Sequence, residues 1–486
     1  MKFGTSGLRG LSVELVELGA RTYAAAFGRY LLDTGKAKTG DAILTGSDLR
    51  ESSPEIKKIC GSVLEGLGFR IVDCGTVPTP ALALYGSKLA AAGLMITGSH
   101  IAADRNGIKF YCANGEINKA DEAAIVALAA EISADKHAPM NREVSHAENH
   151  ANKCHKLFYE RNAKLLADGA LAGLRIGVFQ HSSVARDLIA TLLSQYGAHV
   201  VPIGRSETFI PVDTEAISQE TITSLGGWAV SHGLDAIVSA DGDGDRPLIT
   251  DEVGGPLRGD LIGVITAQFL GAKTVVTPVT SNSAIEALGL FTVIRTKVGS
   301  PFVISGMDEA VAASLERVVG FEANGGVLTA NAFEVARGHL DALPTRDCIL
   351  PILAVLSHIK AQERPLSVIA RSYQLPAAVA GRLENFPVVT SAALMSHLRA
   401  TENLAVFLRE IGQATSTSDI DGIRITLTEG RTIHFRPSGN APELRCYAEA
   451  ATETAALDLL NTGLTQLRLW ADRISEEPLA HEERPN

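Results

Sequence analysis

Three apolar segments that each run into a polar loop constrain the fold of this 486-residue chain more than any other feature. The segments are residues 94–97, 236–239 and 318–321, and the loops are Gly98-Ser-His100, an aspartate-rich run at 241–245, and Glu322-Ala-Asn-Gly-Gly326. A strand-like segment precedes each of them (68–72, 197–201 and 291–294), and stretches of helical period such as 123–132 and 184–196 lie between the strands. Alternating strands and helices predict mainly parallel sheets with covered faces, and such sheets bind ligands at the carboxyl ends of their strands. We therefore expect three similar α/β domains whose loops share one cleft.

The last quarter of the chain predicts a different arrangement. Residues 421–428 alternate as a strand does, Glu429-Gly430 is typical of a hairpin turn, and residues 431–435 form the return strand. A chain of this length exceeds a single hydrophobic core. The sequence therefore predicts three or four domains, the last of which is not a copy of the first three.

The composition of the chain limits the kinds of molecule that it is expected to bind. The net charge of −11 argues against nucleic acid and anionic membranes, so an anionic substrate must be held by a local cluster of Lys and Arg. The N-terminus lacks the apolar core of a signal peptide, and no apolar run has membrane-spanning length. The six cysteines are scattered without a CxxC pair, which is typical of free thiols in a reducing compartment. We expect a cytoplasmic protein.

The aspartate-rich run carries the most specific chemistry. Asp241, Asp243 and Asp245 alternate with glycine, and carboxylates this close repel one another unless a hard cation lies among them. A solvated acidic turn is one alternative. An EF-hand loop is another, since Glu252 falls at its twelfth position, but Arg246 stands where that loop requires glycine. A strand also precedes the run, so we favour a catalytic Mg²⁺ loop, with Arg246 beside it to bind a phosphoryl group.

A second possible metal site is weaker. His146, His150 and Cys154 are spaced four apart in an alanine-rich segment, where they would share a helix face. The segment offers no strand, tight turn or well-spaced fourth ligand. We therefore interpret it as an inter-domain helix or linker.

Two more motifs point to phosphate chemistry. Ser99 and His100 follow a buried strand, and adjacent residues rarely form a hydrolase pair, so Ser99 is better interpreted as a phosphoryl carrier facing the Mg²⁺. The segment from Arg436 to Arg445 brackets Ser438-Gly-Asn440 with two arginines, which indicates a phosphate-binding turn. A plain proline-rich turn remains its alternative.

With these motifs in hand, the chain resembles the α-D-phosphohexomutases, the phosphomannomutase/phosphoglucomutase superfamily. The matching segments occur in family order along the whole chain: FGTSGLRG near the start, TGSH with NGIKF, DGDGDR, EANGG and RPSGNAPELR. The resemblance implies four domains around a central cleft: three similar α/β domains with mixed, mainly parallel sheets and a C-terminal α+β domain. The expected boundaries are 1–155, 156–260, 261–375 and 376–486.

The resemblance also implies roles for individual residues. Ser99 is the expected phosphoserine, and Asp241, Asp243 and Asp245 are the expected Mg²⁺ ligands beside it. Arg9, His100, Lys109 and Arg246 are expected to line the catalytic site. Substrate contacts are expected from Lys297, Glu322, Asn324, Arg436, Ser438, Gly439, Asn440 and Arg445.

Some positions depart from the family pattern. The serine loop usually reads Ala before the serine and His-Asn-Pro after it, whereas this chain has Gly98 and His100-Ile-Ala102. The sugar loop usually reads Glu-x-Ser-Gly, often followed by His, and here Asn324 replaces the serine and the histidine is missing. Asn440-Ala-Pro442 replaces Thr-Glu-Pro. These changes spare the phosphoserine and the aspartates and affect the loops that contact sugar and phosphate.

The expected activity is interconversion of mannose 6-phosphate and mannose 1-phosphate, with a hexose 1,6-bisphosphate as intermediate and activator. Phosphoglucomutase or dual activity is the alternative, and phosphoglucosamine mutase is a weaker one. From other classes, a non-catalytic sugar-phosphate binder and a metal-dependent phosphatase remain open. A monomer or homodimer is expected.

Overall fold

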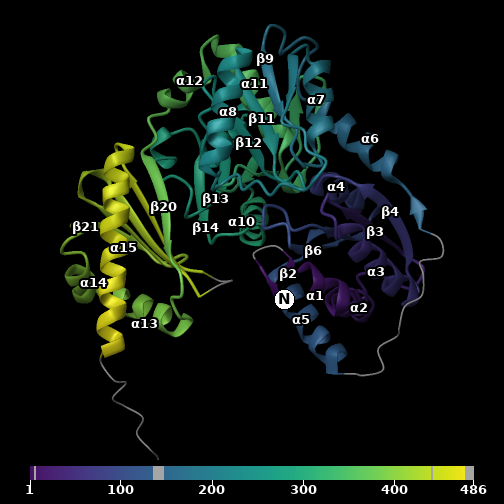
Figure 1. The fold of residues 1–486 in the computed structure, drawn as a ribbon, viewed down its shortest axis with the longest axis horizontal. Helices are drawn as coiled ribbons and strands as arrows, with labels where there is room; N and C mark the ends of the chain where they lie inside the picture. Colours follow the sequence, from purple (N-terminus) through teal and green to yellow (C-terminus); the bar gives the residue numbers. More distant parts are fainter. Residues whose placement is uncertain (5–6, 135–146, 439–441, 477–486) are drawn as a thin grey trace, which may run out of the picture. The chain divides into compact units, whose positions relative to one another are not determined.

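The computed structural model describes residues 1–4, 7–134, 147–438 and 442–476. The chain forms two compact units (Figure 1). The first comprises residues 1–278, 290–294 and 299–373, and the second comprises residues 279–289, 295–298 and 374–486. Three sheets of α/β character followed by an antiparallel sheet confirm the predicted fold class.

The first sheet has eight strands in the order β1-β2-β6-β5-β3-β4-β8, with β7 paired to β6. Its strands are β1 (Lys2–Phe3), β2 (Leu8–Leu11), β3 (Ala42–Ser47), β4 (Arg70–Thr76), β5 (Ala92–Ile96), β6 (Arg105–Cys112), β7 (Gly115–Glu116) and β8 (Glu148–Asn149). Its helical segments are α1 (Ser12–Glu14), η1 (Leu15–Gly19), α2 (Ala20–Asp33), α3 (Ser53–Gly66), α4 (Thr79–Leu89) and α5 (Lys119–Ala134). Strands β5, β3, β4 and β8 are parallel, and β6 reverses direction next to β5. The loop that carries Ser99 therefore leaves the carboxyl end of β5.

The hydrophobic core beneath this sheet includes the apolar face of helix α2. Ala24, Phe27 and Leu31 of α2 recur at i, i+3 and i+7 and are all fully buried. The Phe27 ring packs 5.2 Å from the ring of Phe110 on β6. Burial of one helix face against the sheet fixes β6, the strand that carries Lys109.

The second sheet has the order β10-β9-β11-β12. Its elements are β9 (Arg175–Phe179), β10 (His199–Ile203), β11 (Ala236–Ala240), β12 (Pro247–Thr250), α7 (Arg186–Gln195) and α8 (Gln219–His232). The preceding helix α6 (Ala151–Asn162) packs mainly against α4 and β4 of the first sheet. Strands β10, β9 and β11 are parallel, and β12 is antiparallel to β11. Because Ala240 pairs with Pro247, the six residues 241–246 form a tight connection at the carboxyl end of β11.

The third sheet has the order β14-β13-β15-β16-β19, with a separate hairpin β17-β18. Its strands are β13 (Thr274–Pro278), β14 (Thr292–Thr296), β15 (Val318–Phe321), β16 (Val327–Thr329), β17 (Phe333–Val335), β18 (Gly338–Leu340) and β19 (Leu343–Asp347). Its helices are α9 (Gly259–Phe269), α10 (Ser300–Ala312), α11 (Ile349–Gln362) and α12 (Leu366–Ser372), whereas η2 (Glu286–Leu288) belongs to the second unit. Phe321 pairs with Val327, so the loop 322–326 also closes a turn at a carboxyl strand end. All three predicted loops therefore leave strands in equivalent positions.

The second unit is built on an antiparallel sheet of order β20-β24-β23-β22-β21. Its elements are β20 (Ala377–Leu383), α13 (Val388–Arg399), α14 (Thr401–Phe407), β21 (Ala414–Ser418), β22 (Ile423–Leu427), η3 (Thr428–Gly430), β23 (Thr432–Pro437), β24 (Leu444–Ala450) and α15 (Glu453–Glu476). The predicted hairpin is confirmed as β22 and β23, and Glu429 takes the left-handed φ of 63° at its turn. Throughout the described ranges, no helix is long and apolar enough to span a bilayer.

Candidate active site

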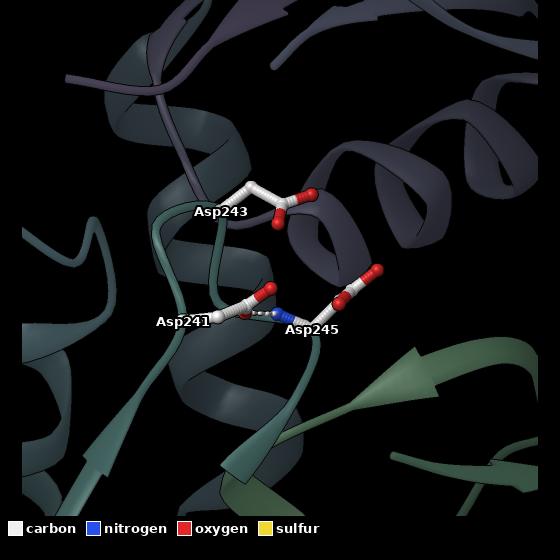
Figure 2. A group of neighbouring side chains, drawn as sticks. All are labelled: Asp241, Asp243 and Asp245. Atoms are coloured by element: carbon white, nitrogen blue, oxygen red, sulfur yellow. Dashed lines mark hydrogen bonds between the residues drawn. The ribbon is translucent and has the colours of Figure 1, made fainter. Parts of the chain in front are cut away.

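The three aspartates of the 241–245 run extend to the same side of the loop between β11 and β12 (Figure 2). Each residue is fully buried, and one carboxylate oxygen from each lies within 4.8 Å of the others. The backbone amides of Asp245 and Arg246 both donate to Asp241 Oδ1 at 3.1 Å, which folds the loop around this carboxylate. Gly244 takes a φ of 66°, a conformation that glycine adopts without strain.

The donor set fits a hard cation. Asp243 Oδ1 and Asp245 Oδ1 are buried and accept no hydrogen bond from any described residue. Unpaired buried carboxylate oxygens are energetically costly, and Mg²⁺ and Ca²⁺ prefer such ligands. Burial, together with the charges of Asp243 and Asp245, raises the pKa of Asp241 well above its usual range. A divalent cation among the three carboxylates would give these oxygens a ligand and would offset the repulsion between their charges.

Two basic side chains neutralise part of the cluster. Lys109 Nζ lies 2.6 Å from both Asp243 Oδ2 and Asp245 Oδ2. Burial disfavours the Lys109 ammonium, but the two carboxylates outweigh it and raise its pKa. Arg346, at the end of β19, donates to Asp245 Oδ2 from Nη2 at 2.7 Å and from Nε at 3.0 Å. Against the effect of burial, Arg346 and Lys109 hold the pKa of Asp245 below its usual range.

Ser99 faces this cluster. Its hydroxyl Oγ donates to Asp241 Oδ2 at 2.5 Å, and its amide donates to Thr97 Oγ1 at 2.7 Å. Ser99 has a φ of 53°, which is uncommon for a residue with a side chain and often marks a functional position. Gly242 makes this approach feasible, because a Cβ at residue 242 would lie 2.8 Å from the Ser99 carbonyl oxygen.

His100 is held neutral beside the serine. Burial, followed by the charges of Arg246 and Arg9, lowers the pKa of His100 to about 2. Arg246 Nη1 lies 2.9 Å from His100 Nδ1. A guanidinium can only donate, so Nδ1 accepts and we assign the ring proton to Nε2. Burial and the nearby cations Arg246 and Arg346 also lower the pKa of Arg9, to about 10.

The sugar-loop candidates join the same cluster through Arg346. Arg346 Nη1 donates to Glu322 Oε2 at 2.8 Å, so one guanidinium connects the 322–326 loop with Asp245. Asn324 Oδ1 accepts from the Gly326 amide at 3.0 Å, and both Glu322 and Asn324 are buried. The first unit thus brings together the serine, the aspartates, Lys109, Arg246 and the sugar loop.

Sequence reasoning missed Arg346 and Thr79. Thr79, at the start of α4, donates from Oγ1 to Asp243 Oδ2 at 2.5 Å, and its amide donates to the Asp243 carbonyl at 2.9 Å. Neither residue belongs to a motif. Their only signal is position: Arg346 is a charged residue near the end of a strand, and Thr79 begins a helix.

Other sequence candidates lie in the second unit. Asp421 Oδ2 accepts from Arg436 Nε at 2.7 Å and from the amide of Val298, next to Lys297, at 2.9 Å. The Ser438 amide donates to the Glu443 carbonyl at 2.9 Å, and Arg445 Nε lies 3.9 Å from Glu443 Oε2. Gly439 and Asn440 lie outside the described residues.

The residues of the two alternative metal motifs make contacts away from the aspartate loop. Glu252 accepts hydrogen bonds from the amide and hydroxyl of Ser367, away from the aspartate loop. His150 precedes α6 and its Nδ1 lies 3.0 Å from the Tyr85 hydroxyl, while Cys154 is buried within the helix. His146 lies outside the described residues. These contacts fit the linker interpretation of that segment.

Sequence comparison supplies the family. Four profiles of the phosphoglucomutase/phosphomannomutase family match in order: alpha/beta/alpha domain I at residues 1–136, domain II at 156–254, domain III at 258–375, and the C-terminal domain at 377–462. The chain belongs to the phosphoglucomutase/phosphomannomutase family. The suspected resemblance is thereby confirmed over most of its length.

Individual relatives agree with this membership. A phosphomannomutase of Sinorhizobium fredii is 54% identical over 467 residues, covering 96% of this chain and 98% of the relative. A phosphomannomutase of Salmonella muenchen is 38% identical, with 96% of both chains covered. A crystal structure of a phosphoglucomutase/phosphomannomutase family protein from Burkholderia thailandensis superposes with a TM-score of 0.73 at 18% identity, covering 96% of this chain and 97% of that one. The last likeness concerns the fold alone.

Proposed function

We propose that this enzyme interconverts mannose 6-phosphate and mannose 1-phosphate through a phosphoserine at Ser99 and a hexose 1,6-bisphosphate intermediate. One observation carries the proposal: the Ser99 hydroxyl lies 2.5 Å from a carboxylate of a fully buried aspartate triad. A hydroxyl in that position can carry a phosphoryl group next to a bound cation. The near full-length relative at 54% identity, a phosphomannomutase, supports mannose as the sugar.

The metal would be Mg²⁺, held by Asp241, Asp243, Asp245 and the phosphorylated Ser99. When bound, it supplies charge neutralisation for the phosphoryl group. Asp243 Oδ1 and Asp245 Oδ1, which are buried and accept no hydrogen bond from the described residues, support this assignment. Lys109, already between those carboxylates, adds positive charge on the same side.

The group transfer balances without an outside reactant. In the first half, the Ser99 Oγ–P bond breaks as a sugar hydroxyl oxygen bonds to the phosphorus; the hydroxyl proton passes to a neighbouring base, and the freed Ser99 oxygen takes up a proton. In the second half, Ser99 Oγ bonds to the phosphorus of the other phosphate as the bond between that phosphorus and the sugar oxygen breaks; the Ser99 proton passes to a neighbouring base, and the freed sugar oxygen takes up a proton. We propose that His100 lines the catalytic site beside the serine, where its Nδ1 lies 3.2 Å from Ser99 Oγ. Arg9 and Arg246 provide charge for the phosphoryl oxygens.

Sugar and distal phosphate would be bound by the remaining candidates. Glu322 and Asn324 present a carboxylate and an amide that can accept from vicinal hydroxyls, and Arg346 holds Glu322 in place. The second unit would bind the phosphate that does not react. The proposed set there is Lys297, Arg436, Ser438, Gly439, Asn440 and Arg445. A fixed phosphate site that ignores the sugar would serve both orientations of the intermediate.

The deciding experiment is ³¹P NMR of the purified protein with Mg²⁺ and a trace of hexose 1,6-bisphosphate. Mannose, glucose and glucosamine 1-phosphates are supplied separately, with Ser99→Ala as the matched control. Conversion of a 1-phosphate signal to a 6-phosphate, lost in the variant, supports the mutase and ranks its sugars. Release of inorganic phosphate alone would indicate a phosphatase, and binding without conversion would indicate a non-catalytic binder.

Three further proposals rest on the same reading of the chain. The domain boundaries are proposed at 155/156, 260/261 and 375/376. The protein is proposed to act in the cytoplasm, which suits six cysteines that are all buried and free. It is proposed to be a monomer or homodimer with a hexose phosphate as its ligand.

A further inference from the structure

Arg50 is a buried arginine that the reaction scheme does not use. It lies between β3 and α3 and is only 2% exposed. Its guanidinium donates four hydrogen bonds, and all four go to main-chain carbonyls of the segment that begins at Ser99. The acceptors are Ser99 O at 3.1 Å, Ile101 O at 2.6 Å, Ala102 O at 2.7 Å and Arg105 O at 2.7 Å. One side chain therefore defines the path of the loop that leaves the serine.

The backbone amide of Ser99 is held by the same segment between β3 and α3 that carries Arg50. Arg50 Nε lies 3.3 Å from Asp48 Oδ2, and Asp48 accepts from Thr97 Oγ1 at 2.8 Å. Thr97 Oγ1 in turn accepts from the Ser99 amide at 2.7 Å. Both main-chain polar groups of Ser99 are thus fixed by residues 48 and 50, directly or through one hydroxyl. This arrangement maintains a serine whose φ is 53°.

The guanidinium lies flat against Gly98. A Cβ built on residue 98 would lie 2.6 Å from Arg50 Cζ and 2.8 Å from Nε, closer than carbon atoms pack. On another side the centroid of the Phe209 ring lies 4.0 Å from Arg50 Cζ, and Phe209 also packs within 3.0 Å of a Cβ position at Gly242. The plane of Arg50 is therefore confined between the serine loop and the residue that packs on the aspartate loop.

We infer that Arg50 is a positioning residue for phosphoryl transfer, and that Gly98 is required because Arg50 occupies the space of its Cβ. Arg50 touches no reacting atom. It acts through the carbonyls that place Ser99 Oγ against Asp241, and its planar fork suits several carbonyls where a lysine ammonium would not. The inference rests on the proposed function and deepens it. It also explains how a loop with His100-Ile-Ala102 in place of His-Asn-Pro is held.

The test is a double-mutant cycle of wild type, Gly98→Ala, Arg50→Ala and the double variant, followed by urea unfolding and by steady-state kinetics. Displacement of the serine by about 1 Å is expected to lower kcat about 100-fold in Gly98→Ala. KM for the sugar phosphate should stay within about threefold, since neither residue contacts the sugar. In the Arg50→Ala background the same Gly98→Ala change should alter kcat less than about threefold, because the clash is gone. Gly227→Ala is the control, since a Cβ there meets nothing within 4 Å.

Each possible result either supports or overturns the inference about Arg50 and Gly98. Additive effects on stability and on kcat would overturn the inference, because the contact would then not exist. Coupling in stability with an unchanged kcat would make Arg50 purely structural and also overturn it. If Arg50→Ala does not fold, Arg50→Lys takes its place: it keeps the charge but offers one ammonium to four carbonyls, and a wild-type kcat would refute the role. A wild type that lacks mutase activity fails the proposed function itself, while the stability cycle still reports the Arg50–Gly98 contact.

Discussion

Lys109→Met removes the cation that Asp243 and Asp245 share. The Lys109 side chain is 7% exposed, and its Nζ lies 2.6 Å from a carboxylate oxygen of each aspartate. Taking one partner from a buried ion pair typically lowers the free energy of unfolding by about 3–5 kcal/mol, because the remaining charge is buried without compensation. Thr79 still donates to Asp243 and Arg346 still donates to Asp245 in the variant, so the loss should stay within that range and not double.

Thermal unfolding in EDTA measures this loss. For a domain of this size class, 1 kcal/mol shifts Tm by about 2–4 °C, so Lys109→Met should lower Tm by about 6–20 °C. Saturating Mg²⁺ should reduce the difference in Tm between wild type and Lys109→Met. The cation then neutralises the carboxylates, and its binding to the folded state adds stability by mass action.

Lys119→Met is the matched control. Lys119 pairs with Glu122 at 2.6 Å on the exposed face of a helix, where such pairs contribute about 0–1 kcal/mol. The reasoning is refuted if, in EDTA, the loss in Tm of Lys109→Met is no larger than that of Lys119→Met. It is also refuted if Mg²⁺ leaves the gap unchanged, since the aspartates would then not be where the destabilisation arises.

Three other outcomes are expected. Thr79→Val should weaken Mg²⁺ affinity about 10–100-fold by isothermal titration, because Asp243 loses the hydroxyl that orients it, and Thr79→Ser should restore most of it. Burial lowers the pKa of His434 from 6.5 to about 4, so between these values only the unfolded chain protonates this residue, and the folded state loses stability as the pH falls. In urea titrations the loss of stability from pH 7 to 5 should be smaller by about 2 kcal/mol in His434→Gln than in wild type. Arg346→Lys keeps the charge but not the fork, so KM for the sugar phosphate should rise about tenfold as Glu322 is released.

Each of these has a contradicting result. Equal affinities for Thr79→Val and wild type would show that the threonine does not orient the metal ligand. An unchanged pH slope in His434→Gln would mean that another group titrates in that range. An unchanged KM in Arg346→Lys would indicate that the guanidinium geometry is irrelevant to Glu322, because a positive charge alone would then hold the carboxylate.

The sequence predicts the strands and loops well because each loop follows a continuous apolar run. Residues 318–321 lead into the sugar loop as β15, and residues 236–239 lead into the aspartate loop as β11. The local spacing of Asp241, Asp243 and Asp245 also makes the cluster predictable, since residues two apart in a tight turn must converge.

The partners of the cluster are less predictable. Arg346 lies 101 positions from Asp245, and Thr79 lies 164 positions from Asp243. Tertiary packing alone brings such residues together, and neither has a local motif. Arg50 is hidden for the same reason: its four acceptors are carbonyls, which every residue possesses and no sequence pattern marks. Only Gly98, at a position where the family pattern has alanine, hints at the space that the arginine fills.

The hydrogen bond from Ser99 to Asp241 spans 142 positions of the chain. A ribosome adding 5–20 residues per second would need roughly 7–28 s to pass from one to the other, and domains tend to fold as they emerge. The first sheet can be complete in that interval, with its serine already set by Arg50, while the aspartates do not yet exist. The nascent chain therefore presents Ser99, the proposed phosphate acceptor, before the three aspartates of the proposed metal site have been synthesised. If Ser99 is phosphorylated by the enzyme's own chemistry, as we propose, that reaction must begin after synthesis of the second sheet, however early the first one folds.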